Sequence, residues 1–360
     1  MILKHPLKEA YEKDHLSAPE AQRMAHFIAF APVVFQTTRL MVKFGIFSLL
    51  RDNDKGLTIA EVAEKTNISH YAAQVLLESS LTAGTVLLND GRFFLSKVGW
   101  FILTDPMILV NMNFIHDVNY LGLFSLEEAL KNGKPEGLKV FGDWTTIYEG
   151  LSSLPPEVQK SWFDFDHFYS DNSFQQALEI VFRHSPKNLL DVGGNTGRWA
   201  LQCVRYSTDV EVTIMDLPQQ IAMMKEQTKN IPEAVRIHGY AADLLDIETI
   251  FPTGFNAIWM SQFLDCFSEE QVFSIVSRAA KSMDSGSRLY IMETFWDRQK
   301  YETSAFDLAQ TSIYFTTMAN GNSKMYYSED MIRLVEKAGL QIENIYDNLG
   351  LGHSILECKI

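Results

Sequence analysis

Residues 188–197 have the sequence NLLDVGGNTG, in which a mostly apolar run leads into a glycine-rich turn. A helical pattern starts directly afterwards, near Arg198. Gly193, Gly194 and Gly197 permit positive φ angles and let a ligand approach the backbone closely. The sequence therefore predicts a strand, a ligand-binding turn and a helix, in this order.

Two common glycine-rich motifs do not fit this turn. A dinucleotide fingerprint requires glycine at its first, third and sixth positions, whereas counting from Gly193 gives Asn195 and Arg198 at the third and sixth. A phosphate-binding P-loop requires Gly-Lys followed by Ser or Thr, and no such sequence follows the turn. Neither an NAD-type site nor a P-loop is expected here.

Helical and strand patterns alternate from Ser173 onward. Apolar, β-type runs occur at residues 188–192, 211–215, 256–260 and 288–292. This alternation predicts an α/β fold with a Rossmann-like, doubly wound and mainly parallel sheet. Ligands of such sheets bind at the carboxyl ends of the strands. Four acidic residues close or follow a predicted strand: Asp191, Asp216, Asp265 and Glu293.

Two acidic positions suit the recognition of a nucleoside. Asp216 ends the second strand, where its carboxylate can accept hydrogen bonds from both hydroxyls of a ribose. Asp243 lies beside Leu244, and this pair suits the edge and the face of an adenine ring. Both aspartates also fit an ordinary role in a turn or helix cap, but their joint occurrence after a glycine turn favours the ligand.

The N-terminal third has the pattern of a winged helix-turn-helix. Residues 21–50 are apolar at helical spacing, Thr58–Glu61 forms a capping box, and Ser69 suits the start of a second helix. Two short apolar runs then flank Asn89-Asp90-Gly91, which is typical of a β-hairpin. The second helix, residues 69–84, contains no Lys or Arg, so we do not expect it to bind nucleic acid. Part of the apolar surface is expected to face another subunit.

Composition and charge limit the class of partner. The 360 residues are 46% hydrophobic, enough for two cores, and the formal charge of −14 disfavours nucleic acids and anionic membranes. Three separated cysteines suggest neither a disulfide framework nor a zinc site: Cys203, Cys266 and Cys358. The first residues have no apolar core of signal-peptide length, and the run 24–35 is too short to span a bilayer. We expect a cytoplasmic protein that binds a small molecule and no metal.

Three parts are expected along the chain. Residues 1–110 form the winged-helix-like domain, residues 111–172 form an aromatic-rich helical connector, and residues 173–360 form the α/β domain. The connector contains Pro155-Pro156 and can contribute to a ligand pocket.

Several segments together resemble the plant-type O-methyltransferase family, which includes caffeic acid-like and hydroxyindole-like enzymes and bacterial members. The likeness rests first on the turn at 189–197 and on residues 215–218, Met-Asp-Leu-Pro. It extends to residues 133–135, 141–142 and 165–173, and covers nearly the whole chain. The resemblance implies a class I methyltransferase domain, an N-terminal winged-helix dimerisation domain and the cofactor S-adenosylmethionine. It also implies a homodimeric enzyme that methylates a small aromatic or polyketide-like acceptor.

By this resemblance the turn meets the amino acid end of S-adenosylmethionine, Asp216 meets the ribose, and Asp243 with Leu244 meets the adenine. Ser173 would reach the cofactor carboxylate, and Phe267 would pack on the adenine, although a phenylalanine there equally suits the core. The cofactor site predicted in this way consists of Ser173, Asp191, Gly193, Gly194, Gly197, Asp216, Leu217, Asp243, Leu244, Ser261 and Phe267.

Family members that methylate phenols usually have a His-Asp-Trp segment whose His takes the hydroxyl proton. The corresponding residues here are Asp265-Cys266-Phe267, so Asp265 stands in the place of the base and the His is absent. Glu293 corresponds to the carboxylate that orients that His, whereas a second acidic partner is replaced near Met325. The resemblance therefore implies Asp265 and Glu293 as the catalytic pair.

An aspartate with an ordinary pKa near 3.9 is a poor base for a phenol near 10, a gap of about eight kcal/mol. Burial and a neighbouring carboxylate raise the pKa of such a pair, and positioning of the acceptor supplies part of the acceleration. His116 and His167 are weaker candidates for the base, and Asp265 also fits the cap of the following helix.

The acceptor pocket is expected to be apolar and aromatic, and Tyr169 falls where the family lines this pocket. The predicted pocket residues are Tyr120, Phe163, Tyr169, Phe263, Tyr314 and Met318. Two other functions stay open from the sequence. One is a catalytically silent dimer that binds S-adenosylmethionine or another ligand, and the other is a winged-helix regulator that binds duplex DNA.

Overall fold

The computed structural model describes residues 1–3 and 6–360. The chain divides into two compact units, one formed by Lys13–His116 and the other by Met1–Glu12 together with Asp117–Ile360. Most of the expected connector lies in the same unit as the sheet. The division into three parts stays a prediction.

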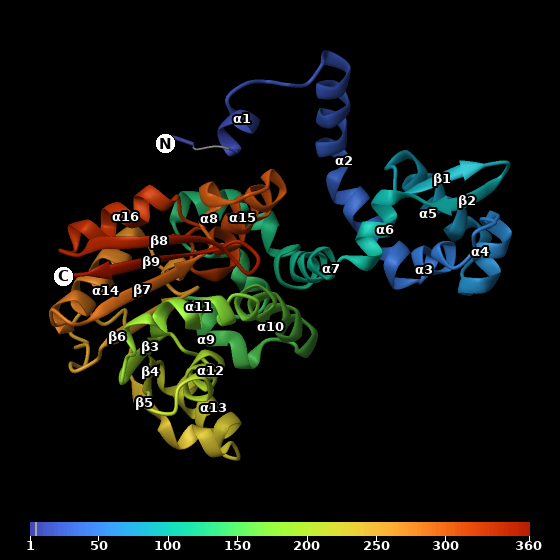
Figure 1. The fold of residues 1–360 in the computed structure, drawn as a ribbon. Helices are drawn as coiled ribbons and strands as arrows, with labels where there is room; N and C mark the ends of the chain where they lie inside the picture. The colour runs from blue at the N-terminus through green and yellow to red at the C-terminus, as the bar shows by residue number, and fades with distance from the viewer. Residues whose placement is uncertain (4–5) are drawn as a thin grey trace. The chain divides into compact units, whose positions relative to one another are not determined.

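The smaller unit combines helices with one hairpin (Figure 1). Its strands β1 (Val86–Asn89) and β2 (Arg92–Leu95) are antiparallel and directly follow a helix pair, in the predicted order. Its helices are α2 (Ala18–Lys43), α3 (Ile46–Arg51), α4 (Ile59–Thr66), α5 (His70–Thr82), α6 (Lys97–Thr104) and α7 (Pro106–Asn113).

Local signals in the sequence explain where these elements begin. Thr58 and Glu61 form the predicted capping box of α4, with the N–H of Thr58 donating to Oε2 of Glu61 at 2.7 Å. Ser69 caps α5 by accepting the N–H of Ala72 at 3.1 Å. Asp90 and Gly91 have φ angles of 47° and 75°, which suit a two-residue hairpin turn.

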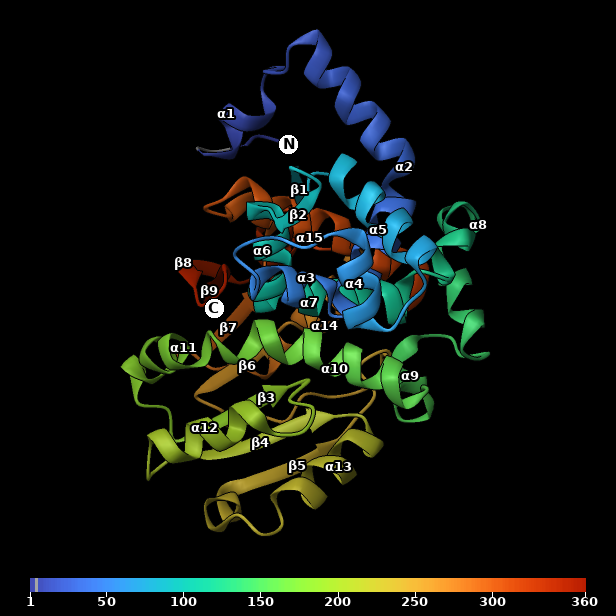
Figure 2. The ribbon, with the colours of Figure 1, turned by 90° about the vertical axis from the view of Figure 1, so that its right-hand side faces the viewer.

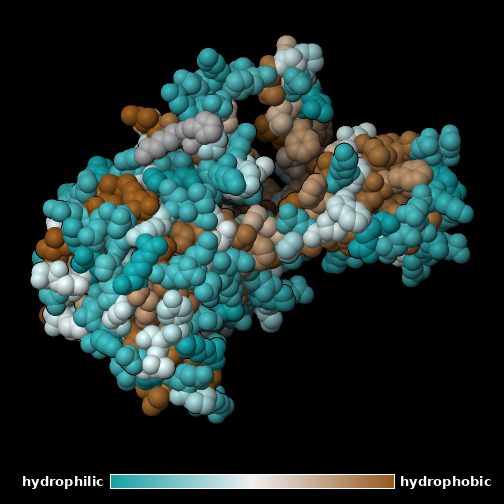
Figure 3. All heavy atoms as spheres, in the orientation of Figure 1, coloured by the Kyte–Doolittle hydropathy of each residue, from teal (hydrophilic) through white to brown (hydrophobic). Residues whose placement is uncertain are grey.

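Helix α2 exposes much of its apolar surface, which Figure 3 shows as brown and tan atoms along the helix. Its exposed large apolar side chains are Met24, Phe27, Ile28, Phe30 and Val33. By length and composition α2 could cross a membrane, as could α6 and Pro106–Asn119 if that bent pair counted as one span. An apolar helix face that packs against a second subunit has the same composition.

The larger unit is built on a seven-stranded sheet with the order β5-β4-β3-β6-β7-β9-β8, in which only β9 runs against its neighbours. The four predicted strands are present within one residue of their expected bounds, and three further strands were not predicted. The strands are β3 (Asn188–Val192), β4 (Glu211–Asp216), β5 (Ile237–Ala241), β6 (Ala257–Ser261), β7 (Arg288–Glu293), β8 (Gln341–Leu349) and β9 (His353–Lys359).

Helices cover both faces of this sheet (Figures 1 and 2). On one face, α11 (Phe174–Val181), α12 (Arg198–Tyr206) and α13 (Pro218–Thr228) share a core with β3 and β4. On the other face, α14 (Glu269–Ser282) and α16 (Ser328–Lys337) share a core with β6 and β7. The remaining helices of this unit are α1 (Leu7–Tyr11), α8 (Leu126–Asn132), α9 (Ile147–Gly150), α10 (Pro156–Asp171) and α15 (Glu302–Tyr314).

The strand order fixes where a ligand can bind. The chain proceeds outward from β3 to β5 and then returns to β6 on the other side of β3. This reversal opens a crevice at the carboxyl ends of β3 and β6, which is the usual ligand site of such sheets. The glycine-rich turn follows β3 and the segment Phe263–Asp265 follows β6, so the fold brings them to the same edge.

Candidate cofactor and acceptor site

The turn between β3 and α12 has a backbone that glycine adopts readily. Gly193 and Gly197 have φ angles of 73° and 84°, and Asn195 has a φ of 49°. A Cβ atom on Gly194 would lie 2.5 Å from Oδ2 of Asp191, so this position has no room for a side chain. The turn therefore presents bare backbone at the edge of the sheet.

Asp216 closes β4 and holds the turn in place. Its Oδ2 accepts a 2.8 Å hydrogen bond from the N–H of Asn195, and its Oδ1 accepts one of 2.7 Å from the N–H of Leu217. A carboxylate has about four lone-pair directions, so both oxygens keep capacity for ribose hydroxyls. Burial raises the pKa of Asp216, and the two N–H donors oppose this increase. The roles of Asp216 and Leu217 at a ribose stay predictions that fit this geometry.

Asp191 lies in β3, directly behind the turn, and is only 2% exposed. Burial raises the pKa of Asp191 to about 8, and the charge of Asp216 adds to the increase. Within the described residues its Oδ2 has no hydrogen-bond partner. The protonated acid is therefore the main form of Asp191 at pH 7, and its contact with a cofactor stays a prediction.

The predicted adenine side lies in the loop after β5. Asp243 is exposed, and its Oδ1 accepts a 2.9 Å hydrogen bond from the N–H of Leu245, which is the turn role that the sequence also allowed. Leu244 is buried in the core, and Phe267 is partly buried against the same core. The ring of Phe267 meets that of Phe263 edge-on, with centroids 4.8 Å apart. Contacts with adenine stay predictions.

Ser173 is fully buried and hydrogen-bonded to a residue that the sequence did not indicate. Its Oγ lies 2.8 Å from Nδ1 of His353, whose Nε2 lies 3.1 Å from Oε1 of Gln262. Since the glutamine oxygen only accepts, Nε2 donates to it and Nδ1 accepts the serine hydroxyl. These two hydrogen bonds link Ser173 to His353 in β9, and His353 to Gln262, which directly follows Ser261 at the end of β6. The contacts of Ser173 and Ser261 with a cofactor stay predictions.

The predicted catalytic pair is assembled by the fold. Asp265 and Glu293 are 5% and 2% exposed, although they are 28 positions apart in the sequence. Glu293 ends β7, and its Oε1 accepts the N–H groups of Phe263 at 3.1 Å and Leu264 at 2.8 Å. Burial raises the pKa of Glu293 well above its usual value, and the charge of Asp265 adds to the increase.

Burial likewise raises the pKa of Asp265 to about 7, with a further contribution from the charge of Asp166. The gap to a phenol thereby shrinks from about six pKa units to about three, or about four kcal/mol. An acid with a pKa near the working pH is suited to general acid–base chemistry. The free-energy gap that argues against an aspartate base thus falls by about half, from about eight to about four kcal/mol.

Two neighbours of Asp265 were not identified from the sequence. The thiol of Cys266 donates to Oδ1 of Asp265 at 3.4 Å, and the hydroxyl of Tyr148 in α9 hydrogen-bonds to the same thiol. Desolvation raises the pKa of Tyr148 well above its usual value. The amide of Asn320 also donates to the carbonyl of Cys266. None of these residue types forms a recognisable motif, and only tertiary contacts bring them to Asp265.

Aromatic side chains of α10 and α15 contact one another, and one of them, Tyr314, lies near Asp265. Tyr314 is buried, its hydroxyl accepts the indole N–H of Trp162 at 2.7 Å, and the charge of Asp265 acts on it. Phe163 packs edge-on against Trp162 at 5.1 Å between centroids. Tyr120, Tyr169 and Phe263 are partly buried, and Met318 is fully buried. Their roles at an acceptor stay predictions.

The two alternative bases have other neighbours. Nδ1 of His116 lies 3.2 Å from the amide nitrogen of Gln36, and both residues belong to the smaller unit. His167 stacks near Phe163 and lies 4.0 Å from the carboxylate of Asp166. Burial lowers the pKa of His167. Of the candidates, Asp265 alone is joined to Glu293 through the backbone segment 263–265.

Family models match most of the chain. A model described as the Dimerisation2-like domain matches residues 22–93, and a model described as the O-methyltransferase domain matches residues 125–341. The chain belongs to the O-methyltransferase family. The predicted resemblance, the methyltransferase fold class and the enzyme class are confirmed.

Two curated relatives are 22% and 24% identical to this methyltransferase. L-tyrosine C(3)-methyltransferase from Streptomyces lavendulae is 22% identical over 88% of this chain and 86% of that protein. 3-Hydroxy-5-methyl-1-naphthoate 3-O-methyltransferase from Streptomyces sahachiroi is 24% identical over 74% and 75%. The family thus includes enzymes named for methylation of carbon as well as of oxygen.

Solved structures share the fold. The S-adenosylmethionine-dependent methyltransferase SibL, solved in its apo form, has a TM-score of 0.70 at 20% identity and covers 92% of this chain and 97% of its own. Human N-acetylserotonin methyltransferase, solved with S-adenosylmethionine, has a TM-score of 0.66 at 15% identity, covering 97% and 99%.

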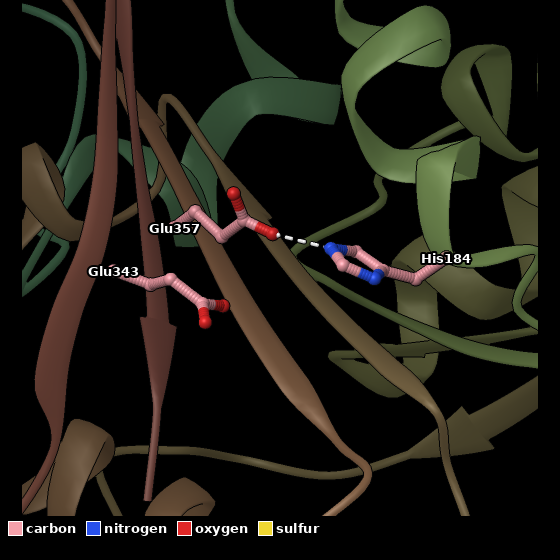
Figure 4. A group of neighbouring side chains, drawn as sticks. All are labelled: His184, Glu343 and Glu357. Atoms are coloured by element: carbon pink, nitrogen blue, oxygen red, sulfur yellow. Dashed lines mark hydrogen bonds and ion pairs between the residues drawn. The ribbon is translucent and has the colours of Figure 1, made fainter.

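One cluster of side chains in the methyltransferase unit has the composition of a metal site, namely His184, Glu343 and Glu357 (Figure 4). Nε2 of His184 is 2.9 Å from Glu357, and Glu343 forms ion pairs with Arg288 at 2.6 Å and Lys359 at 3.0 Å. Glu357 also accepts hydrogen bonds from Asn344 and Tyr346. The carboxylate oxygens of Glu357 are already hydrogen-bonded, and the cluster lies at the end of the sheet opposite the glycine turn. We therefore assign the cluster a structural role.

His353, the buried histidine that is hydrogen-bonded to Ser173, should make the stability of the methyltransferase depend on pH. Burial lowers the pKa of His353 to about 4, so below pH 6.5 the unfolded chain binds a proton that the folded chain does not. The stability contribution is therefore lost as the pH falls from about 6.5 to 4, by about 3 kcal/mol. His353→Gln should remove this loss, measured by urea unfolding at pH 7 and pH 4 beside the wild type.

The exposed His238 offers a matched control, because His238→Gln removes a histidine from the surface of the same unit. The interpretation is wrong if His353→Gln loses as much stability on acidification as the wild type does, or if both variants behave alike.

Proposed function

We propose that this methyltransferase transfers the methyl group of S-adenosylmethionine to a small aromatic acceptor, most simply to a hydroxyl oxygen. The observation that carries the proposal is the bare glycine turn with Asp216 bonded across it at the end of β4. The aromatic side chains around Asp265 suit a planar acceptor. The relatives named for L-tyrosine and for a hydroxynaphthoate support an aromatic acceptor class.

Asp265 is the proton acceptor in this proposal. S-adenosylmethionine supplies an activated methyl group when it is bound, and Asp265 takes the proton of the acceptor hydroxyl. Glu293 acts through the backbone, because its carboxyl holds the N–H groups of Phe263 and Leu264 and so fixes the segment that carries Asp265. The buried aromatic surroundings exclude water from the reacting groups.

Calorimetric titration with S-adenosylmethionine tests the proposal. We expect saturable binding by the wild type and a loss of about 10- to 100-fold in affinity for Asp216→Ala, since charge-assisted hydrogen bonds to a ribose contribute about 1.5–3 kcal/mol. Asp209→Ala, at an exposed aspartate that pairs with Lys187, is the control and should bind like the wild type. No binding by the wild type, or full affinity of Asp216→Ala, would contradict the proposal.

We also propose that the protein is a homodimer and that the winged-helix-like unit serves dimerisation rather than DNA binding. The support is the exposed apolar face of α2 within the region that matches the Dimerisation2-like model. All three cysteines are free thiols, in keeping with a reducing cytoplasm.

The double variant Ile28→Glu, Phe30→Glu should therefore be a folded monomer where the wild type is a dimer. These side chains are 66% and 62% exposed, so the charges cost little in a monomer but disrupt an apolar interface. Size-exclusion chromatography with light scattering gives the mass. Val235→Glu alters an equally exposed apolar residue of the other unit and should stay dimeric. A monomeric wild type, or a dimeric double variant, contradicts the assignment.

A further inference from the structure

Asp265 and Glu293 form a buried acid pair whose strongest electrostatic neighbours are themselves acids. Oε2 of Glu293 has no hydrogen-bond partner within the described residues, and Asp265 is contacted by a thiol, which is a weak donor. Apart from the backbone N–H groups that Oε1 of Glu293 accepts, the contacts described here bring the pair no strong donor and no cation, so burial favours a proton on the pair in the absence of a positive charge.

The groups that face Asp265 come from several elements. Glu293 comes from β7, Asp166 from α10, Tyr148 from α9 and Tyr314 from α15. Cys266 and Tyr326 complete the set, and all of these groups are neutral or negative when they titrate. Arg198 pairs with Asp171 at 2.7 Å, and its charge lowers the pKa of Asp166.

The methyl donor supplies the charge that this site lacks. S-adenosylmethionine carries a positive sulfonium, whereas S-adenosylhomocysteine has a neutral sulfur in its place and otherwise the same groups. A cation near a buried carboxyl favours its ionised form.

We propose that Asp265 and Glu293 form a charge-gated proton acceptor, which holds a proton while the site is empty or contains S-adenosylhomocysteine and releases it when S-adenosylmethionine binds. The inference rests on the proposed function of this site. It means that the ionised form of Asp265, which can take the proton of the acceptor, is favoured only when the methyl donor is present.

The charges of Asp265 and of the donor sulfur then cancel both before and after methyl transfer. Before methyl transfer, Asp265 is a carboxylate beside a positive sulfur. An electron pair of the acceptor oxygen forms the bond to the methyl carbon, the sulfur–methyl bond breaks with its electron pair passing to sulfur, and Asp265 takes the hydroxyl proton. Afterwards Asp265 and the sulfur are both neutral, so Asp265 is left protonated as it was before the donor bound.

The sign of the pH dependence follows from the pKa of Asp265, which burial raises to about 7. Below that pH, binding of S-adenosylmethionine must expel the proton, so its affinity should rise about fivefold from pH 6 to pH 7 and level off above it. The affinity of S-adenosylhomocysteine should change much less. Asp191 and Asp216 also titrate, but they face groups that both ligands share, so the ratio of the two affinities cancels their effects.

Proton counting by calorimetry tests the inference without any variant. Titrations of the wild type at pH 6, in buffers of different ionisation enthalpy, should show release of about half a proton or more in excess for S-adenosylmethionine over S-adenosylhomocysteine. Equal proton release for the two ligands overturns the inference. An absence of binding by either ligand instead overturns the proposed function on which it rests.

Two matched variants assign the proton. Asp265→Asn should abolish the excess proton release, whereas Asp166→Asn should keep it, although burial raises the pKa of Asp166 to about 6 as well. The inference is wrong if Asp166→Asn alone removes the release, or if Asp265→Asn leaves it unchanged. If Asp265→Asn does not fold, Glu293→Gln tests the same pair and should reduce the excess release.

Discussion

Replacing Gly194 by alanine is expected to weaken the binding of S-adenosylmethionine by up to about a hundredfold. The new Cβ atom would lie 2.5 Å from Oδ2 of Asp191 and 2.9 Å from the side chain of Ile214, and both of these side chains are buried. Neither can move aside without disturbing the sheet, so the turn itself must shift. Overpacking of this kind costs about 1–3 kcal/mol, and the upper value corresponds to a factor above one hundred in affinity.

Calorimetric titration with S-adenosylmethionine measures this effect, and circular dichroism shows whether the variant stays folded. Gly286→Ala is the matched control, because its Cβ atom would meet only Asp284, at 3.4 Å, far from the turn along the chain. We expect wild-type affinity for that variant. Wild-type affinity of Gly194→Ala would show that the turn does not approach the cofactor.

Replacing Asp265 by asparagine is expected to lower the rate of methyl transfer by about 10²- to 10⁴-fold, the usual contribution of a general base. Asparagine has nearly the same shape but cannot take a proton from the acceptor. Binding of S-adenosylmethionine should persist, because the turn and Asp216 are unchanged. Release of S-adenosylhomocysteine measures turnover, with L-tyrosine and 3-hydroxy-5-methyl-1-naphthoate as acceptors of the class that the relatives use.

Glu269→Gln removes a more exposed carboxylate at the start of the following helix and is the control, with turnover expected within about twofold of the wild type. Turnover of Asp265→Asn equal to that of the wild type would exclude Asp265 from catalysis. An absence of turnover by the wild type with these acceptors, together with tight cofactor binding, would favour the catalytically silent alternative.

Strong periodic patterns accounted for most of the fold. The runs at 188–192, 256–260 and 288–292 are strands that are buried on both faces, which requires a nearly continuous apolar sequence. The run at 211–215 alternates between buried and half-buried residues. The strand β5 was not predicted, since it lies at an edge of the sheet and four of its five residues are exposed. A strand in such a place carries little apolar signal.

The residues of the candidate site also fall into two groups, those that the sequence predicted and those that only the structure revealed. The turn and the position of Asp216 at the end of a strand follow from local sequence, because glycine conformation and strand-end chemistry depend on residues close together in the chain. His353 could not be connected to Ser173, 180 positions away, from its sequence context. The hydrogen bond between Tyr148 and Cys266 likewise joins residues that are 118 positions apart in the sequence.

The sequence by itself determined that a glycine-rich turn lies at the carboxyl edge of a parallel sheet, since backbone freedom and apolar periodicity are local properties. It also placed Asp265 where the family has its histidine, but it left that residue with the pKa of an ordinary aspartate. Only the tertiary structure decided that Asp265 is buried beside Glu293 and away from strong cationic partners. The reason is that a pKa depends on solvation and neighbouring charges, which exist only once distant segments have packed together.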